Sequence, residues 1–485
     1  MKVLFVNPPF KPQKGKFSRT SRSPAITKGG TIYYPFWLTY SAGVLAKNGF
    51  EISFIDAAAD KKEVTELMAS IKQLSPELIV FDTSTPSIYS DIEIVDSIKN
   101  ILPKSFVVLV GTHPSALPNE TISLSKNIDA VAVKEYDYTI RDLAVCLRNK
   151  QDISKVNGLI YRNKNGDIKT NEPRSLIENL DELPFVTEIY KKFLNIRNYF
   201  FAACDYPMVM IITGRGCPNR CFFCVYPQVF HSRKYRFRSP ENVVEEFEYI
   251  KNNLPEVREI GIEDDTFTVN KKRVQEICCL LIKKNIKIKW YCNVRVDLDL
   301  ETMKIMKRAG CVLVTVGFES LSQEILNNIH KGTTVEQIIK FVKDTKKAGL
   351  LVHAAYMVGN PGETKESLEN MLALAKKMNT DSAQFYPLVV YPGTEAYKWA
   401  KDNGYLITED YTKWADENGG YSCLISTPFL SKNEVLNFCQ KANKEYYLRL
   451  RYIFYKLAYT LIHPYEIRRI LKASKTFFNF LFQRG

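Results

Sequence analysis

The chain has 485 residues, 45% hydrophobic and 25% charged, with a formal net charge of +14. This ordinary globular composition predicts two or three domains, and 11 cysteines in so long a chain exclude a small disulfide-stapled secreted protein. The N-terminus has no basic leader and no charge-free apolar run is long enough to span a membrane, so we expect a cytoplasmic chain whose positive charge meets an anionic partner.

The first 150 residues alternate β-branched runs with helical patterns, which is typical of a doubly wound parallel sheet. We expect a flavodoxin-like domain over residues 1–150. Its predicted strands are 3–8, 51–56, 78–85, 106–111 and 130–135. Residues 151–205 follow as a hairpin with an Asn-Gly turn and a proline-punctuated linker, which together predict a domain boundary.

A second series of strands and helices occupies residues 206–400 and predicts a partial (β/α)6 barrel. Its expected strands are 208–214, 259–265, 288–295, 312–320, 350–359 and 382–390. Active sites of such folds lie at the C-terminal ends of the strands. Polar residues gather at these ends: Thr213, Asp264, Asp265, Asn293, Arg295, Glu319, Ser320 and Asn360.

Three cysteines, Cys217, Cys221 and Cys224, lie in the stretch GRGCPNRCFFC after the first strand of this series. Thiolates select zinc, copper(I) or iron–sulfur clusters. A structural zinc site takes four protein ligands, and the nearest further candidates, Cys204 and His231, fall outside the usual paired spacing. A four-iron cluster on three cysteines leaves one iron open to a small molecule, which explains the missing fourth ligand.

This C-x3-C-x2-C spacing, with the aromatic Phe223 before the last cysteine, resembles the signature of the radical S-adenosylmethionine (radical SAM) superfamily. The resemblance extends through the barrel and implies that Cys217, Cys221 and Cys224 ligate a [4Fe–4S] cluster whose open iron binds SAM. It also implies that an external one-electron reductant drives SAM cleavage to a 5′-deoxyadenosyl radical, which removes hydrogen from carbon.

The resemblance assigns further residues to SAM. The stretch IEDDTF, with Glu263, Asp264 and Asp265, stands where the family has a Gly-Gly-Glu segment that binds the amino group of SAM. Because the Gly-Gly pair is missing here, the sequence leaves open which of the three acids makes this contact. Arg295 is expected to pair with the methionine carboxylate, or alternatively with Asp297 or Asp264 in a rim salt bridge. The remaining SAM positions are Phe223 in the cysteine motif, Glu319 in VGFES for the ribose or methionyl group, and Gly359 in YMVGNPGET for the adenine.

A flavodoxin-like domain before such a barrel resembles the cobalamin-binding class of radical SAM enzymes. The residues that carry this likeness follow strand ends, in NPP, DTSTPSIYSD and VGTHPSALPNE. The implied cobalamin contacts are Thr83, Ser84 and Thr85 at the nucleotide tail, Gly111, Thr112, His113 and Pro114 along the corrin, and Glu135 after the fifth strand. Because no Asp-x-His-x-x-Gly element is present, we expect no histidine ligand beneath cobalt; a domain that has lost cobalamin is the alternative.

Within this class, GRGCPNRCFFCVYPQ, YRFRSPENV and GIEDDTFTVN are most similar to the branch of the magnesium-protoporphyrin oxidative cyclase and the hopanoid-tailoring enzymes. This implies an enzyme that abstracts hydrogen from an unactivated carbon and methylates, cyclises or rearranges a hydrophobic lipid, isoprenoid or tetrapyrrole. One alternative is a radical SAM enzyme that modifies RNA, a peptide or a natural product, although a methylthiotransferase would need cluster cysteines that residues 1–145 lack. The other is a non-enzymatic iron–sulfur electron carrier or sensor.

Residues 401–485 predict a helical region that ends in a basic, aromatic tail. A helix over 465–482 would place its apolar residues on one face: Ile467, Ile470, Leu471, Phe478 and Leu481. Arg468, Lys472 and Lys475 would lie opposite, so a peripheral contact of 464–485 with an anionic membrane is one interpretation and a helix that caps the barrel is the other. No recognised binding module accompanies the charge, and we expect no nucleic acid.

Overall fold

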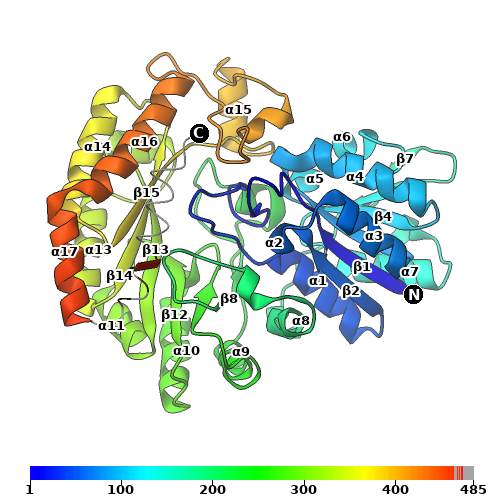
Figure 1. Ribbon diagram of the computed structural model, residues 1–485, viewed down its shortest axis with the longest axis horizontal. Coiled ribbons are helices and arrows are strands. Elements are labelled where there is room, and N and C mark those ends of the chain that lie inside the picture. The colour runs from blue at the N-terminus through cyan, green and yellow to red at the C-terminus, as the bar shows by residue number, and fades with distance from the viewer. Residues whose placement is uncertain (464–466, 468, 470, 473–485) are drawn as a thin grey trace.

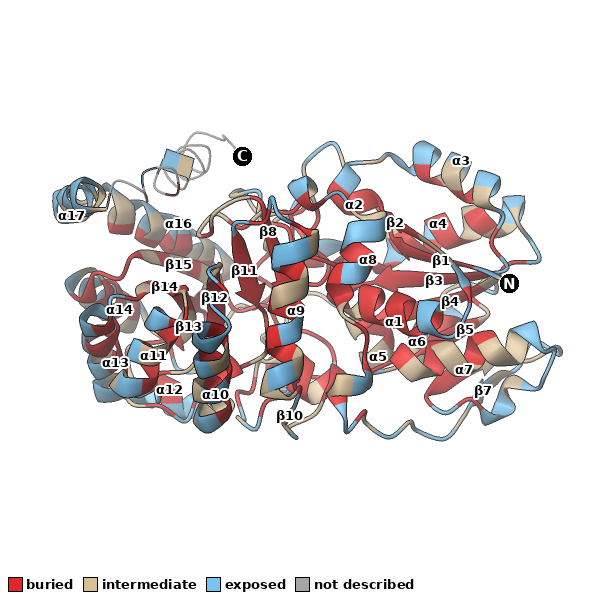
Figure 2. Ribbon diagram, turned by 90° about the horizontal axis from the view of Figure 1, so that it is seen from below, coloured by how far each residue is buried: buried red, intermediate tan, exposed pale blue. Residues whose placement is uncertain are grey.

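The computed structural model describes residues 1–463, 467, 469 and 471–472. Two large sheets stand side by side, an N-terminal one in blue and cyan and a second one in green and yellow (Figure 1). Their strands are buried, whereas the outer sides of the surrounding helices are exposed (Figure 2). The predicted fold class is confirmed: a flavodoxin-like domain, a partial (β/α)6 barrel and a mainly helical C-terminal region.

The N-terminal sheet has the strand order β2-β1-β3-β4-β5-β6-β7, parallel through β5 and antiparallel at β6 and β7. Its strands are β1 (Lys2–Asn7), β2 (Glu51–Asp56), β3 (Leu78–Thr83), β4 (Phe106–Gly111), β5 (Ala130–Ala132), β6 (Leu159–Arg162) and β7 (Ile168–Thr170). The helices are α1 (Phe36–Lys47), α2 (Ala57–Asp60), α3 (Val64–Leu74), α4 (Ile88–Ile101), α5 (Thr112–Ala116), α6 (Pro118–Ser123) and α7 (Asp137–Arg148). The predicted hairpin therefore extends this sheet, because β6 pairs with β5.

The barrel sheet is parallel throughout, in the order β15-β14-β13-β12-β11-β8. Its strands are β8 (Met208–Ile211), β11 (Glu259–Ile262), β12 (Lys289–Val294), β13 (Cys311–Glu319), β14 (Leu351–Val358) and β15 (Ser382–Pro387). The accompanying helices are α8 (Val186–Phe193), α9 (Pro240–Asn253), α10 (Lys271–Lys283), α11 (Leu300–Arg308), α12 (Gln323–Asn328), α13 (Val335–Ala348) and α14 (Lys365–Met378). Since β8 and β15 each have one neighbour in this sheet, the barrel is open.

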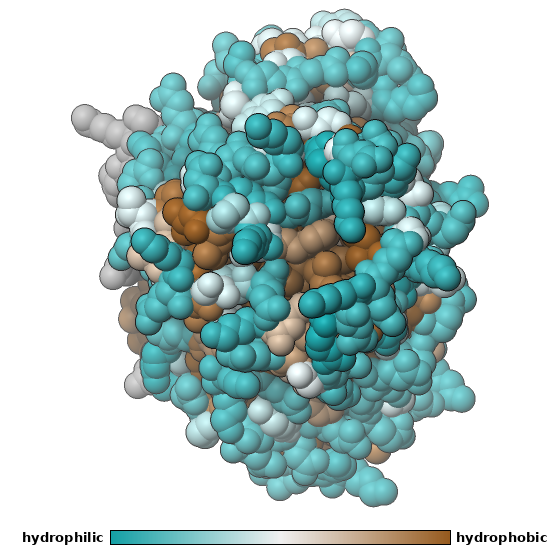
Figure 3. Space-filling model, turned by 90° about the vertical axis from the view of Figure 1, so that its right-hand side faces the viewer, coloured by the Kyte–Doolittle hydropathy of each residue, from teal (hydrophilic) through white to brown (hydrophobic). Residues whose placement is uncertain are grey.

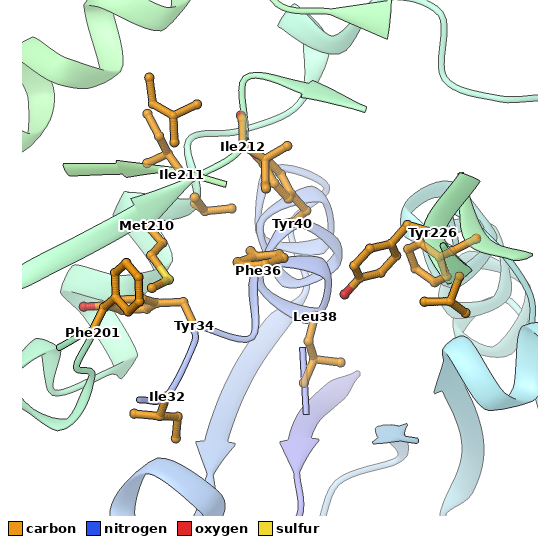
Figure 4. Close-up of a cluster of buried hydrophobic side chains, with 14 of the residues drawn as sticks. Ile32, Tyr34, Phe36, Leu38, Tyr40, Phe201, Met210, Ile211, Ile212 and Tyr226 are labelled. Atoms are coloured by element: carbon orange, nitrogen blue, oxygen red, sulfur yellow. Dashed lines mark hydrogen bonds between the residues drawn. The ribbon is translucent and has the colours of Figure 1, made fainter. Parts of the chain in front are cut away.

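Tyrosine side chains cover the open edge of β8. Hydroxyl groups of Tyr34, Tyr190 and Tyr40 donate hydrogen bonds of 2.9, 3.1 and 2.9 Å to backbone carbonyls. The acceptors are alternate residues of one strand edge: Met208, Met210 and Ile212. Figure 4 shows Tyr34 and Tyr40 beside Met210 and Ile212, so the N-terminal part of the chain holds the strand that leads to the cysteines.

Residues 8–35, the N-terminal strap, connect β1 to α1 and lie between the two sheets (Figure 1). Arg19 of the strap is buried and donates to Asn7 Oδ1 at 2.6 Å, to the Pro8 carbonyl at 2.8 Å and to Asp91 Oδ1 at 2.9 Å. The backbone N–H of Ile26 donates to the Gly419 carbonyl at 2.7 Å. The strap is therefore fixed at both of these points.

The C-terminal region contains α15 (Glu395–Asp402), α16 (Lys432–Leu448) and α17 (Leu450–Ile462). Helix α16 packs on β15, where Asn443 donates to the Phe385 carbonyl at 2.9 Å. Helix α17 contains no buried residue. Within residues 1–463, 467, 469 and 471–472, no helix is long and apolar enough to cross a membrane.

Most of the tail helix predicted at 465–482 lies outside the described residues. Of its described members, Arg469 forms an ion pair of 2.6 Å with Glu259, and Lys472 donates to the Phe201 carbonyl at 3.1 Å. Ile467 and Leu471 remain 45% and 63% exposed. These two basic side chains thus bind the barrel instead of facing outward.

Candidate active site

The loop after β8 carries Cys217, Cys221 and Cys224 at the C-terminal end of the barrel. It begins with β9 (Gly214–Arg215), which pairs with β10 (Arg236–Phe237). Gly216 has φ +85°, and a Cβ atom there would lie 2.2 Å from the Lys234 carbonyl oxygen, so only glycine fits. The side-chain amide of Gln228 donates to the carbonyls of Phe222 and Cys224 at 3.0 and 2.9 Å. The three thiols are therefore held on one braced loop.

Donors near these thiols favour negative charge on sulfur, although no three His, Cys, Asp or Glu side chains in the described part of the chain are already placed to hold a metal ion. The amide of Asn219 donates to Cys217 Sγ at 3.2 Å, and Arg295 Nη1 lies 4.0 Å from Cys221 Sγ. Burial raises the pKa of the Cys224 thiol well above its usual value, with further contributions from Asp265 and Cys221. Metal binding therefore has to release the proton of this thiol. Cys204 and His231 do not join the three cysteines. Cys204 is buried near Glu259. His231 binds Glu135.

The end of β11 supplies the acids Glu263, Asp264 and Asp265. The Asp264 carboxylate accepts two hydrogen bonds of 2.6 Å from the N–H and hydroxyl of Thr213, so it fixes the start of the cysteine loop. Its carbonyl oxygen instead accepts from Asn293 at 3.1 Å. Asp265 is the acid with spare capacity, since its Oδ2 is buried and has no hydrogen-bond partner in the described chain. Asp265 thus fits an incoming cation best.

Arg22 of the N-terminal strap also reaches the end of β11. Its Nη2 donates to the carbonyl oxygens of Asp264 and Glu263 at 2.9 and 3.2 Å. Its guanidinium nitrogens lie 3.5 Å from Glu263 Oε2 and 3.7 Å from Asp265 Oδ1. A positive charge from another part of the chain therefore occupies the place that the sequence analysis assigns to the amino group of SAM.

Glu319 ends β13 with φ 62°, a conformation that non-glycine residues rarely adopt and that often marks a functional site. Its carboxylate accepts from Lys331 Nζ at 2.9 Å and from the Tyr386 hydroxyl at 3.0 Å. A Cβ atom on Gly317 would lie 2.0 Å from Glu319 Oε1. The shift in strand register between Gly317 and Glu319 thus places the Glu319 carboxylate directly over Gly317.

Arg295 and Phe223 meet Lys331 beside the cysteine loop. Arg295 Nη2 donates to the Lys331 carbonyl at 2.6 Å, and no ion pair with Asp297 or Asp264 is found within the described chain. Lys331 Nζ lies 5.9 Å from the centre of the Phe223 ring. Burial opposes the charge of Lys331, but Glu319 and Cys221 raise its pKa above the usual value. Lys331 and Arg295 therefore bring positive charge to the Cys221 side of the cluster site.

Gly359 begins the loop after β14 with φ +99°. Its N–H donates to Glu363 Oε2 at 2.7 Å, and the N–H of Asn360 donates to the same oxygen at 2.9 Å. A Cβ atom on Gly359 would lie 3.2 Å from Ile425. The glycine therefore permits a tight turn that Glu363 organises, and its contact with adenine stays a prediction.

The predicted cobalamin contacts follow β3 and β4, where Gly111, Thr112, His113 and Pro114 lead into α5. The Thr83 hydroxyl donates to Asp91 at 2.6 Å, Ser84 pairs with Ser87 at 2.9 Å, and Thr85 lies 3.1 Å from His113 Nδ1. His113 Nε2 is buried and lacks a hydrogen-bond partner among the described residues. Burial lowers the pKa of His113 to about 3, so the ring is neutral. Among these residues, His113 has a free nitrogen that fits a polar group of a bound cofactor.

Glu135 lies in a buried group of charges between the two domains, together with Asp137, Arg215, His231 and Arg236; we call this group the interdomain charge cluster. The Glu135 carboxylate accepts from Arg236 at 2.8 Å and lies 3.0 Å from His231 Nδ1 and 3.6 Å from Arg215. Arg215 also pairs with Asp137 at 2.7 Å. The structure thus gives Glu135 a role between the domains, and its contact with cobalamin stays a prediction.

Sequence reasoning missed Arg22, Lys331 and Tyr411. Arg22 stands 241 positions before Glu263, and no motif links the two. The Tyr411 ring lies 4.9 Å from the His113 ring, which only the folded chain reveals. For Lys331 the sequence signal was weak, because it consists only of a lysine before a glycine, shortly after α12 ends. In the structure that glycine, Gly332, has φ +64°.

Comparison with known protein families finds two matches in this chain. Residues 211–375 match the radical SAM superfamily, and residues 22–144 match the B12 binding domain. Both ranges agree with the order of domains described above.

Among curated proteins, an uncharacterised methyltransferase of Pyrococcus horikoshii is 31% identical over 450 residues, 93% of this chain and 93% of that protein. The anaerobic magnesium-protoporphyrin IX monomethyl ester cyclase of Rubrivivax gelatinosus is 26% identical, over 82% of this chain and 70% of that protein. Among solved structures, the radical SAM methyltransferase TsrM of Kitasatospora setae, with cobalamin and a [4Fe–4S] cluster bound, has a TM-score of 0.69 and 16% identity. The alignment with TsrM covers 91% of this chain and 88% of that one.

Proposed function

The chain belongs to the radical SAM superfamily and carries a B12-binding domain, and from that premise we propose that it functionalises an unactivated carbon of a hydrophobic substrate. It is an enzyme of the radical SAM type, with a [4Fe–4S] cluster, SAM and cobalamin as cofactors. The observation that carries the proposed radical chemistry is the convergence of the cysteine loop, the β11 acids and the N-terminal strap at one end of the barrel.

In this proposal, Cys217, Cys221 and Cys224 hold the cluster, and Asp265 with the β11 carbonyls holds the amino group of SAM. Glu319 and Arg295 complete the SAM site. Thr85 and His113 face cobalamin. When bound, these cofactors supply hydrogen abstraction from carbon together with methyl transfer or assistance to a cyclisation or rearrangement.

The chain's own contribution is to orient these groups and to exclude water. Asp264 fixes the cysteine loop through Thr213, and Lys331 with Tyr386 fixes the Glu319 carboxylate. The interdomain charge cluster and the tyrosines along β8 join the two domains around the site. A preorganised, closed site of this kind favours reactions whose intermediates water would quench.

The hydrophobic substrate is supported first by a relative whose printed name is a cyclase of magnesium-protoporphyrin IX monomethyl ester. It is supported also by α17, whose large apolar side chains face outward. Leu450, Phe454, Leu457, Leu461 and Ile462 are 70%, 65%, 57%, 84% and 72% exposed. An apolar patch of this kind on a helix marks an interaction surface.

We propose that α17 touches an anionic membrane from the cytoplasmic side while the substrate is taken up. Helix α17 contains no acid. From residue 446 to 485 the sequence has eight Lys and Arg residues and one acid, although Lys456, Arg469 and Lys472 contact the protein itself. Arg451 is exposed at the start of the apolar face. By contrast, the opposite end of the molecule, formed by the N-terminal domain, is mostly hydrophilic with scattered apolar patches (Figure 3).

The membrane contact is tested by flotation with liposomes that contain anionic lipid. The triple variant Phe454→Ser, Leu457→Ser and Leu461→Ser is expected to stop floating, whereas Phe429→Ser, which changes an apolar side chain that is 59% exposed outside α17, is expected to float like the parent. Equal flotation of both variants contradicts the contact.

The substrate is tested by comparing lipid and pigment extracts of cells with and without the gene. The expected result is a methylated, cyclised or otherwise tailored hydrophobic compound that disappears with the gene. Unchanged extracts, together with an altered RNA nucleoside or water-soluble metabolite, contradict the hydrophobic substrate and favour the alternative radical SAM chemistry.

A further inference from the structure

We propose that Arg22 is a built-in competitor of SAM: its guanidinium holds the end of β11 while SAM is absent and has to leave when the amino group of SAM arrives. The inference rests on the proposed SAM site and adds a control of access to it. The control comes from the N-terminal strap, which also contacts the cobalamin-binding domain.

First, Arg22 occupies a site formed by hydrogen-bond acceptors. The groups that Arg22 contacts there are hydrogen-bond acceptors: the carbonyl oxygens of Glu263 and Asp264 and the carboxylates of Glu263 and Asp265. Asn293 also donates to the Glu263 carboxylate and the Asp264 carbonyl. A set of acceptors with two negative charges selects a cation. Two cations cannot share these oxygens at a few ångströms, because like charges repel most strongly where water is excluded.

The second step is that Arg22 fills this site incompletely. Its contacts to the carbonyls are 2.9 and 3.2 Å, but those to the carboxylates are 3.5 and 3.7 Å. Asp265 Oδ2 has no hydrogen-bond partner in the described chain, although the side chain is only 7% exposed. Both Glu263 carboxylate oxygens already accept from Tyr291 and Asn293, so Asp265 Oδ2 is the unused oxygen here. A compact ammonium group with three N–H donors matches it better than the broad guanidinium does.

The third step is that Arg22 has room to leave. Its side chain is 36% exposed, whereas that of Arg19, three residues earlier, is 1% exposed and is fixed to Asp91. Ile26, four residues later, is fixed to Gly419. The strap is thus pinned on both sides of Arg22, and the expected movement is confined to this side chain and the residues next to it.

The strap also connects the site to the cysteine loop and the cobalamin side. The carbonyl of Thr20 accepts a hydrogen bond of 2.6 Å from Tyr226, two positions after Cys224. Arg19 lies against β1 and α4 of the cobalamin-binding domain through Asn7 and Asp91.

The test is the affinity for SAM, measured by equilibrium dialysis on chains loaded with the cluster and kept free of reductant. If Arg22 occupies the site about nine-tenths of the time, it weakens apparent SAM binding about tenfold. Arg22→Gln is then expected to bind SAM about tenfold more tightly than the parent. Lys14→Gln removes a charge from an exposed position of the same strap and is expected to change nothing.

A second measurement follows hydrogen exchange of the backbone amides at residues 21–23. SAM is expected to speed exchange there in the parent and in Lys14→Gln, but to have little effect in Arg22→Gln, where the side chain is already absent from β11. This readout needs no turnover.

The direction of the change in SAM affinity between the parent and Arg22→Gln tests the proposal. Weaker binding by Arg22→Gln would identify Arg22 as a ligand of SAM and overturn the proposal, and unchanged binding would overturn it as well. If no cluster-loaded chain binds SAM, parent included, the proposed SAM site itself fails and the inference fails with it.

Discussion

Replacement of Glu135 by Gln tests whether the interdomain charge cluster holds the two domains together. The variant keeps the size of the side chain but removes the negative charge that faces Arg236, Arg215 and His231. Arg215 keeps Asp137 at 2.7 Å, whereas Arg236 keeps only the Ile177 carbonyl, also at 2.7 Å, among its described partners. An uncompensated buried charge of this kind costs about 3–5 kcal/mol.

The assay is urea unfolding followed by tryptophan fluorescence; one of the four tryptophans, Trp37, has its ring 4.5 Å from that of His231. The matched control is Glu178→Gln, which breaks an ion pair of 2.7 Å with Lys234 whose side chains are 64% and 61% exposed. That exposed pair is expected to contribute about 0–1 kcal/mol. Equal, small shifts of the unfolding midpoint in the two variants would refute the reasoning.

The pH dependence gives a second check on Glu135. Burial opposes its charge, but hydrogen bonds from Arg236 and His231 hold the pKa of the Glu135 carboxyl well below its usual range. A depressed folded-state pKa gives stability that is present above the unfolded pKa, about 4.3, and is lost as the pH falls through the folded value. The difference between parent and Glu135→Gln is therefore expected to stay constant from about pH 6 upward and to shrink only in acid.

Two further predictions concern the SAM site. Gly317→Ala places a Cβ atom 2.0 Å from Glu319 Oε1, so the Glu319 carboxylate has to leave Lys331 and Tyr386. We expect weaker SAM binding in equilibrium dialysis with little change in iron content. Unchanged SAM binding would contradict a contact between Glu319 and SAM. Burial raises the pKa of Glu363 to about 7, so its stabilising effect is complete below about pH 4.5 and is lost as the pH rises toward 7. Glu363→Gln is expected to remove this fall in the free energy of unfolding, which is on the order of 3 kcal/mol over that range. A pH profile parallel to that of the parent would contradict the raised pKa.

Local patterns made much of the fold predictable. The strands at 51–56 and 106–111 have the predicted bounds. For 106–111 the reason is that a strand buried within a parallel sheet reads as a short apolar run between turn signals. The strand at 51–56 lies at the edge of the sheet and is partly exposed. The cysteine loop was equally visible, since its three cysteines lie within eight residues of one another. The strand predicted at 130–135 ends instead at Ala132, and the chain then turns Glu135 toward Arg236.

Long-range pairing was not predictable. Glu135 stands 101 residues before Arg236, and Arg22 stands 241 residues before Glu263, so neither contact leaves a periodic or spaced signal in the sequence. The sequence identified the acids of IEDDTF as site residues, but it did not predict the different contacts of Asp264 and Asp265. Only the folded chain shows that Asp264 is committed to Thr213 while Asp265 keeps a free oxygen.

The central claim is that Cys217, Cys221 and Cys224 hold a cluster that cleaves SAM. The direct measurement is anaerobic reconstitution with iron and sulfide, followed by iron analysis and by chromatography of SAM products after addition of a one-electron reductant. About four irons per chain and reductive cleavage are expected for the parent and for Cys279→Ala, which removes an exposed thiol on α10. The triple alanine variant of the three cysteines is expected to lose both the iron and the cleavage, and reductive cleavage that persists in that variant would contradict the claim.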